Sequence, residues 1–202
     1  MRWLRGGPDG NEQLTAATGV VLLVLLAALG ITILRIGQLI SEHLFLGLLL
    51  LGPVGLKMAT TGYRFVRYYT RHAEYVRRGP PELWLRLLGP AVVFSTLGVF
   101  ATGVWLLIVG PAQRNPALLL HKVTFIVWGV VTGLHVLGHL AQMPRALRAP
   151  SLDGTGLGGG QAGRAGRGLA LAAAIVAGLV LAIALIPDFS SWTSGMSSFH
   201  HG

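Results

Sequence analysis

Long apolar stretches alternate with short polar segments along this chain, and five of the stretches are long enough to cross a bilayer. A membrane-spanning helix needs about 20 mostly apolar residues. The pattern therefore predicts an all-α integral membrane fold, in which the first four spans form a four-helix bundle and a fifth transmembrane helix follows at the C-terminal end. The predicted spans are residues 14–35, 42–61, 88–110, 118–141 and 168–187.

A glycine-rich stretch separates the fourth predicted span from the fifth. It reads APSLDGTGLGGGQAGRAGR, has few side chains that could pack, and is typical of a linker. We therefore expect a four-helix unit at 1–141, a cytoplasmic linker at 142–167, and a lipid-facing anchor with an extracytoplasmic tail at 168–202. The fifth span has no polar side chain inside it, so any chemistry is expected in the four-helix unit.

The composition agrees with a membrane protein. The 202-residue chain is 52% hydrophobic and 11% charged, whereas a soluble domain has about 25% charged residues. It contains no cysteine. This excludes disulfides, thiolate-bound iron–sulfur clusters, covalent c-type haem attachment and thiol catalysis.

The net charge of +9 is mostly a signal of membrane topology. Twelve of the sixteen lysines and arginines lie in the N-terminal leader and in the loops 62–87 and 142–167. The positive-inside rule then places the N-terminus in the cytoplasm and the C-terminus outside. The Ala, Gly, Leu and Arg bias favours a bacterial inner membrane. Because the basic residues are divided among loops at the membrane edge, we do not expect a nucleic-acid partner.

Three histidines interrupt the fourth predicted span, LLLHKVTFIVWGVVTGLHVLGHL, residues 118–140. At about 100° per residue, His121, His135 and His139 lie along one stripe of a helix. His121 and His135 would be about 21 Å apart along its axis, which suits two haems stacked across one bilayer. His43 opens the second span on the same outer side as His121. We therefore expect these two imidazoles to ligate one outer haem b from facing helices.

This arrangement resembles the bacterial membrane-bound di-haem b-type cytochromes that serve hydrogenases and formate dehydrogenases. Their fourth helix carries two haem histidines with 13 residues between them, as His121 and His135 have here. A histidine opens their second helix on the outer side, as His43 does here. The resemblance covers about residues 14–141. It implies quinone-linked electron transfer through the membrane, in partnership with a dehydrogenase or reductase.

The first span departs from the family pattern, because it has no histidine for the inner haem. The second-span residues level with His135 are Lys57 and Met58. The resemblance therefore leaves Met58 as the ligand opposite His135 or His139. Lys57 would instead neutralise a propionate of the inner haem, and Arg35 would pair with a propionate of the outer one. His139 remains open as an alternative ligand, a hydrogen-bond donor to a ligand, or a quinone contact.

Other functions stay open at this stage. Titrating histidines could line a proton or metal path in a small transporter, and a plain membrane anchor or assembly subunit would need none of them. The pair His135 and His139 could also bind zinc, although no acidic residue lies nearby to complete a site. Because we find no nucleotide-binding loop and no flavin domain, we expect at most an electron-transfer subunit of a quinone-linked oxidoreductase.

Two segments outside the spans have their own character. TGYRFVRYYTRHAEYVRRGPPE, residues 61–82, interleaves aromatic residues with arginines and is typical of an anchor at the membrane surface. SSWTSGMSSFHHG, residues 190–202, is expected to be a flexible tail.

Overall fold

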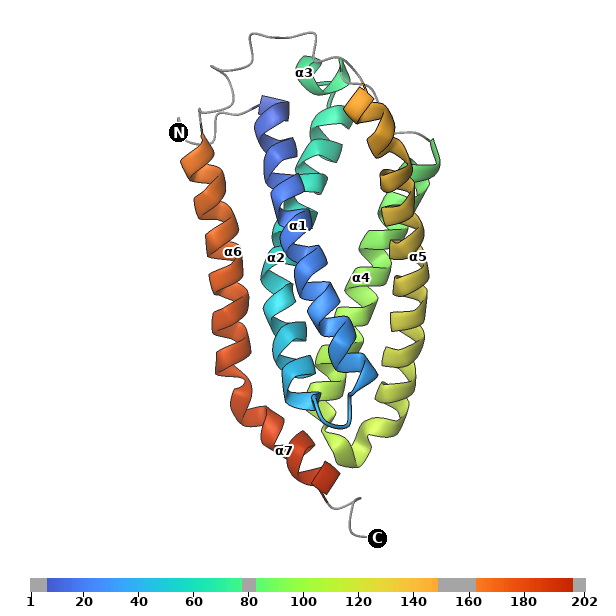
Figure 1. Ribbon diagram of the computed structural model, residues 1–202, viewed down its shortest axis with the longest axis vertical. Coiled ribbons are helices and arrows are strands. Elements are labelled where there is room, and N and C mark those ends of the chain that lie inside the picture. The colour runs from blue at the N-terminus through green and yellow to red at the C-terminus, as the bar shows by residue number, and fades with distance from the viewer. Residues whose placement is uncertain (1–6, 78–82, 149–162, 198–202) are drawn as a thin grey trace. The chain divides into compact units, whose positions relative to one another are not determined.

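The computed structural model describes residues 7–77, 83–148 and 163–197, and these form seven α-helices and one short 3₁₀ helix without any strand (Figure 1). The prediction of an all-α fold is confirmed. Five of these helices are long and apolar enough to cross a membrane, as expected for a multi-pass membrane protein. Each overlaps one of the five predicted spans, and several begin earlier or end later than predicted. The elements are α1 (Gly7–Leu34), α2 (Ile40–Tyr69), α3 (Ala73–Val76), α4 (Leu83–Val109), η1 (Pro111–Gln113), α5 (Arg114–Arg148), α6 (Arg164–Ala184) and α7 (Ile186–Ser197).

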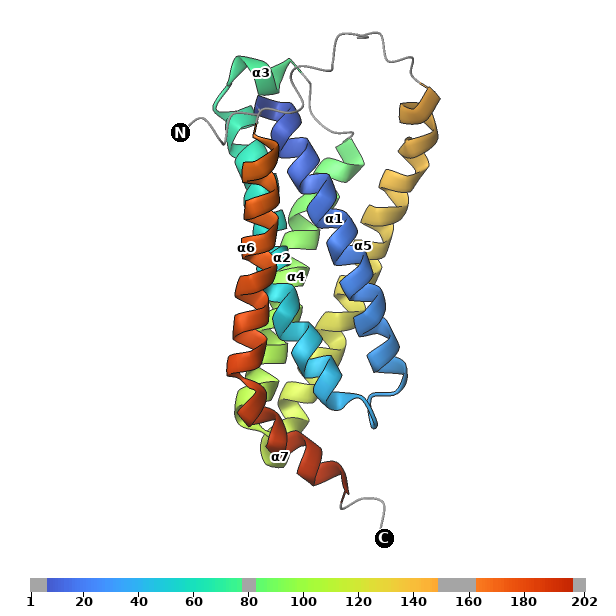
Figure 2. The ribbon, with the colours of Figure 1, turned by 60° about the vertical axis from the view of Figure 1, so that its left-hand side comes forward.

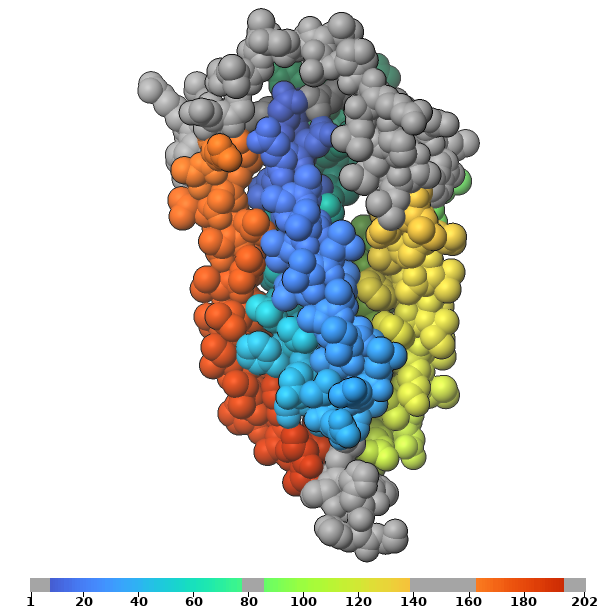
Figure 3. Space-filling model, viewed as in Figure 1, coloured from blue at the N-terminus to red at the C-terminus, as the bar shows by residue number. Residues whose placement is uncertain are grey.

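The chain forms two compact units. The first comprises Met1–Tyr75 with Gly159–Gly202, and the second comprises Val76–Gly158. Within the first unit, α2 packs against both α1 and α6, as the ribbons in Figures 1 and 2 show, and atoms of α2 are visible between α1 and α6 in Figure 3. The second unit is a hairpin of α4 and α5. The fifth predicted span, α6, thus has a protein neighbour along its length in addition to lipid.

The contact between α2 and α6 depends on a proline and two glycines. Pro53 has no N–H, so the Leu49 carbonyl one turn earlier lacks its helical donor. Gly178 of α6 lies against this carbonyl, where an added Cβ would stand 2.1 Å from the Leu49 oxygen. A Cβ on Gly52 would stand 1.9 Å from the carbonyl oxygen of Ala174. Only glycine permits this approach, which brings backbone Cα–H groups against carbonyl oxygens across the interface.

Short turns join the antiparallel pairs. After α1, the N–H groups of Gln38 and Leu39 both donate to the Arg35 carbonyl at 2.9 Å, which reverses the chain into α2. After α4, Gly110 has a φ of +70° and Pro111 opens η1. A side chain at position 110 would be strained in this left-handed conformation, so glycine is required there.

Residues 61–77, the described part of the segment at 61–82, are more regular than a surface loop. α2 continues through its arginines and tyrosines to Tyr69. Two residues later, Arg71 has a φ of 58°, the left-handed conformation that follows the end of many helices. His72 accepts a hydrogen bond from Arg67, and the buried Tyr75 of α3 packs edge-on against Tyr63 with 6.1 Å between ring centroids. Burial raises the pKa of the Tyr75 hydroxyl, and the nearby Tyr63 adds to this shift. These contacts fold the chain back at the end of α2.

The C-terminal tail differs from its prediction as a flexible segment. Residues Ile186–Ser197 form α7, which packs on α2 and α6. Phe189 and Trp192, one turn apart, are only 6% and 7% exposed. Burial of these two large apolar side chains stabilises the helix and explains the difference. His200 and His201 lie outside the described residues.

Replacing Gly52 by alanine should lower the free energy of unfolding by about 1–3 kcal/mol, because the new methyl group meets the Ala174 carbonyl. Gly55 is the matched control on the same helix, since a Cβ there has no neighbour within 4 Å. Gly55→Ala should therefore leave stability unchanged or raise it by up to about 1 kcal/mol. Loss of helical circular dichroism during titration with dodecyl sulfate measures both. Equal stability of the two variants would contradict the close α2–α6 contact.

Candidate functional site

His43 is held by a threonine of the preceding helix. Its Nδ1 lies 2.9 Å from Oγ1 of Thr32 on α1, across the turn between α1 and α2. The Thr32 hydroxyl donates its single hydrogen to the Leu29 carbonyl at 2.6 Å. We therefore assign Nδ1–H of His43 as the donor and the Thr32 oxygen as the acceptor. This assignment places the lone pair of the imidazole on Nε2.

His121 repeats this arrangement in the second unit. Its Nδ1 lies 3.1 Å from Oγ1 of Thr102 on α4, and the Thr102 hydroxyl lies 2.9 Å from the Gly98 carbonyl to which it donates. Thr124 Oγ1 is 2.9 Å from the same hydroxyl. A Cβ on Gly103 would stand 3.1 Å from Cε1 of the ring, so this glycine leaves room for the imidazole. The His121 ring also hydrogen-bonds the Val99 backbone. With Nδ1–H assigned as the donor to Thr102, the lone pair of His121 is again on Nε2.

This geometry is compatible with a histidine that binds a metal. A hydrogen bond at one ring nitrogen fixes the tautomer and the ring orientation, and the other nitrogen becomes the ligand. His43 and His121 are both half-buried and lie in candidate membrane spans. They belong to different units, and their meeting on one iron stays a prediction.

The residues predicted for an inner site lie on α2 and α5. Met58 is half-buried on α2, and His135 is half-buried on α5. Thr132, one turn before His135, has a buried Oγ1 with no hydrogen-bond partner among the described residues. Its hydroxyl therefore has unused hydrogen-bonding capacity. His139 continues α5, but its side chain lies outside the described part of the chain.

Lys57 takes part in a closed ring of hydrogen bonds between α1 and α2. Its Nζ donates to the Thr15 carbonyl at 2.7 Å, and the Thr15 hydroxyl donates to the Asn11 carbonyl at 2.7 Å. The Asn11 amide donates to the Thr60 carbonyl at 3.1 Å, and the Thr60 hydroxyl donates to the Lys57 carbonyl at 3.0 Å. Arg35, the other predicted propionate partner, is exposed in the turn after α1. The ring fixes where Lys57 presents its N–H groups.

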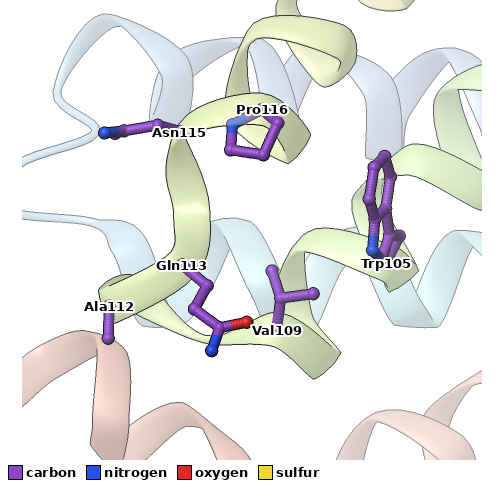
Figure 4. A pocket seen from close by; sticks show the side chains of 6 residues that line it. All are labelled: Trp105, Val109, Ala112, Gln113, Asn115 and Pro116. Atoms are coloured by element: carbon purple, nitrogen blue, oxygen red, sulfur yellow. The ribbon is translucent and has the colours of Figure 1, made fainter.

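The second unit also has an open recess of about 450 Å³ at the turn between α4 and α5 (Figure 4). It combines an indole, an aliphatic wall and two side-chain amides, and sequence reasoning did not find it. Its lining residues are Trp105, Val109, Ala112, Gln113, Asn115 and Pro116.

Sequence reasoning also missed Thr32 and Thr102. The available signal was a threonine inside the apolar span that precedes each histidine. Among the described side chains, no three His, Asp or Glu residues gather as they would around a metal ion held by the protein alone. A haem iron needs fewer protein ligands, because the porphyrin supplies the other donors and helices contribute single axial histidines.

Replacing Thr102 by valine should remove one of the hydrogen bonds of the His121 ring, leaving the one to the Val99 backbone, and should allow more of the second neutral tautomer. The ring ¹⁵N chemical shifts, measured without added haem, should then move from a single tautomer toward an average. Thr102→Ser keeps the hydroxyl and should keep the wild-type shifts. Thr18→Val is the control, because the Thr18 hydroxyl, which is fully buried, donates to Leu14 of its own helix. Unchanged His121 shifts in Thr102→Val would contradict the assigned hydrogen bond.

Comparisons with known proteins found no relative of this chain. No protein-family model, no curated protein and no solved structure matches the chain. The function is therefore argued from the side chains described above.

Proposed function

We propose that this protein is a membrane-embedded b-type cytochrome subunit, which carries electrons between a quinone pool and a redox partner protein. The observation that supports this most strongly is the pair of imidazoles, His43 and His121. Each lies in a membrane span and has its Nδ1 within hydrogen-bond distance of a threonine hydroxyl, so that the assigned tautomer makes Nε2 the nitrogen that would bind a metal.

The residues present fit a haem b. His43 and His121 would supply the axial nitrogens of an outer haem, as bis-histidine ligation requires. His135, with Met58 as its opposite ligand, would hold a second, inner haem. The buried hydroxyl of Thr132, one turn before His135, would hydrogen-bond a polar group of that haem. A bound haem b supplies a one-electron carrier inside the bilayer, where the side chains alone offer none.

The remaining predicted residues, Arg35 and His139, would contact groups around the haem irons and would not be axial ligands of the outer haem. Arg35, in the turn after α1, suits an outer propionate because its guanidinium is exposed at the end of the span. His139 would contact a ligand, an inner haem or a quinone from the last turns of α5. The absence of cysteine from the chain favours non-covalent haem b over c-type attachment.

A histidine-lined transporter is the main competitor. Proton and metal paths usually include intramembrane carboxylates. The described carboxylates of the five spans lie only in the first two turns of α1 and α2, at Asp9, Glu12 and Glu42. This distribution favours the redox function.

Purified protein from haem-replete cells should show the reduced-minus-oxidised bands of haem b. His43→Ala and His121→Ala should each remove the outer haem and lower the pyridine haemochrome count by one per chain. His72→Ala is the control, because His72 lies after the end of α2 and contacts Arg67.

A colourless wild-type protein would refute the redox proposal. In that case, pH-dependent proton or metal flux in liposomes would identify a transporter. A protein that shows neither flux nor haem, and whose histidines are all dispensable in cells, would be an anchor or assembly subunit.

We also propose a topology in a bacterial inner membrane, with the N-terminus in the cytoplasm and the C-terminus outside. The arginine-rich end of α2 supports it. Because the chain has no cysteine, single-cysteine variants can test it directly. Gln38→Cys and Ser190→Cys should react with an impermeant maleimide in intact spheroplasts, whereas Thr70→Cys should react only after permeabilisation. The reverse pattern of labelling would invert the orientation.

A further inference from the structure

Three arginines near the end of α2 form no ion pair with any residue that the structure describes. Arg64 and Arg67 lie one turn apart on the last turns of the helix, and Arg71 follows its end at Tyr69. Glu74, the described carboxylate nearest to them in the chain, pairs with none of them. Positive charge is therefore concentrated at this end of α2, where it attracts anions.

The length of α2 places these arginines at the depth of the lipid headgroups. α2 has 30 residues, which corresponds to about 45 Å along its axis, whereas the hydrocarbon core of a bilayer is about 30 Å thick. The predicted second span ends at residue 61, so Arg64 and Arg67 lie about 4 and 9 Å beyond it. The headgroup layer adds roughly 5–8 Å on each side.

Aromatic side chains on the same stretch agree with this depth. Phe65 and Tyr69 are 56% and 48% exposed, and their ring centroids are 4.5 Å apart. Exposed aromatic rings are typical of the boundary between headgroups and hydrocarbon. The anion that a bilayer offers at this depth is the phosphate of a lipid.

Arg67 differs from the other two arginines, because its guanidinium is held in place. It is half-buried, its Cζ lies 5.4 Å from the centroid of the Tyr63 ring, and its Nη1 donates to His72. Tyr63 is in turn contacted edge-on by Tyr75 of α3, which is only 8% exposed. Figures 1 and 2 show α3 at this end of α2. A buried tyrosine thus anchors the ring that positions the arginine.

Most N–H groups of Arg67 have no acceptor. A guanidinium has five N–H donors in a fixed planar arrangement. One donates to His72, and no other described residue accepts a hydrogen bond from Arg67. Nε is buried, so a ligand would meet the two Nη groups. The planar guanidinium fits phosphate oxygens with two parallel hydrogen bonds.

We propose that Arg67 binds the phosphate of one anionic phospholipid in the leaflet at this end of α2, while Arg64 and Arg71 add positive charge on either side of it in the chain. A zwitterionic lipid carries its own cation beside the phosphate, so an anionic lipid gains more from three arginines without ion pairs. Because Tyr63 and His72 fix the guanidinium before binding, less entropy is lost when the lipid binds. The site contains no haem ligand and does not depend on the proposed cytochrome function.

The test counts lipids bound to the full chain by native mass spectrometry, during titration with phosphatidylglycerol or phosphatidylcholine. One phosphatidylglycerol should bind more tightly than those that follow, and more tightly than any phosphatidylcholine. Arg67→Gln should weaken this first binding by about tenfold to a hundredfold, as the loss of charge-assisted hydrogen bonds implies. Arg164→Gln is the control, because it removes the same charge from an exposed position at the start of α6. It should bind phosphatidylglycerol like the wild type.

A pair of tyrosine variants keeps every charge and tests how Arg67 is positioned. Tyr63 and Tyr69 are both 48% exposed on α2. Arg67 lies over the ring of Tyr63, whereas the ring of Tyr69 lies against those of Phe65 and Tyr68. Tyr63→Leu should weaken the first phosphatidylglycerol binding, and Tyr69→Leu should leave it unchanged. Because both side chains are exposed, both variants should fold normally.

Several outcomes would overturn this proposal. Equal affinity for the two lipids, or wild-type affinity in Arg67→Gln, would exclude a selective phosphate site. Arg67→Lys keeps the charge but loses the planar fork, so wild-type affinity in both Arg67→Lys and Tyr63→Leu would show that total charge alone attracts the lipid. If the water-soluble headgroup glycerophosphoglycerol bound as tightly as the lipid and displaced it, the ligand would be a soluble phosphate compound.

Discussion

The absence of water from the bilayer interior is the constraint on which this structure depends. A polar group in a span must find a partner in its own helix or in a neighbouring one. In this protein the neighbouring helix supplies it for each of three key groups: Thr32 for His43, Thr102 for His121 and the Thr15 carbonyl for Lys57. These hydrogen bonds fix the rotation of each helix about its axis, which apolar packing alone leaves loosely defined. They therefore determine which side chains line a common interface.

The same constraint explains how α6 joins the first unit. Pro53 removes one backbone donor from α2. The Leu49 carbonyl, which is left without its helical donor, would otherwise face hydrocarbon. Gly178 covers this carbonyl, and Gly52 makes the reciprocal approach to Ala174. A helix without polar side chains can thus have a specific partner, because close backbone contact needs small residues and not polar ones. The C-terminal helix is more than a lipid anchor in this respect.

His43 and His121 each have a threonine hydroxyl at Nδ1, although the sequences around the two histidines differ. Thr32 precedes His43 by 11 residues, and Thr102 precedes His121 by 19. In both cases the threonine hydroxyl keeps its own hydrogen within its helix and accepts the imidazole N–H. Lys57 and its ring belong to the first unit, as do His43 and Met58.

Sequence alone determined the five spans, because the length of an apolar run is a property of the chain in one dimension. It also determined which spans contain histidines and that any site must form without cysteine. It could not identify Thr32 and Thr102 as partners, because the apolar residues of α1, α4 and α5 are spread around each helix, so their sequences do not specify which face meets a neighbour. For the same reason it could not assign α6 to α2, or show that Lys57 donates to the Thr15 carbonyl of α1. Only the tertiary structure decided these contacts, since in lipid any apolar face is acceptable and the few polar and backbone groups that need partners select among them.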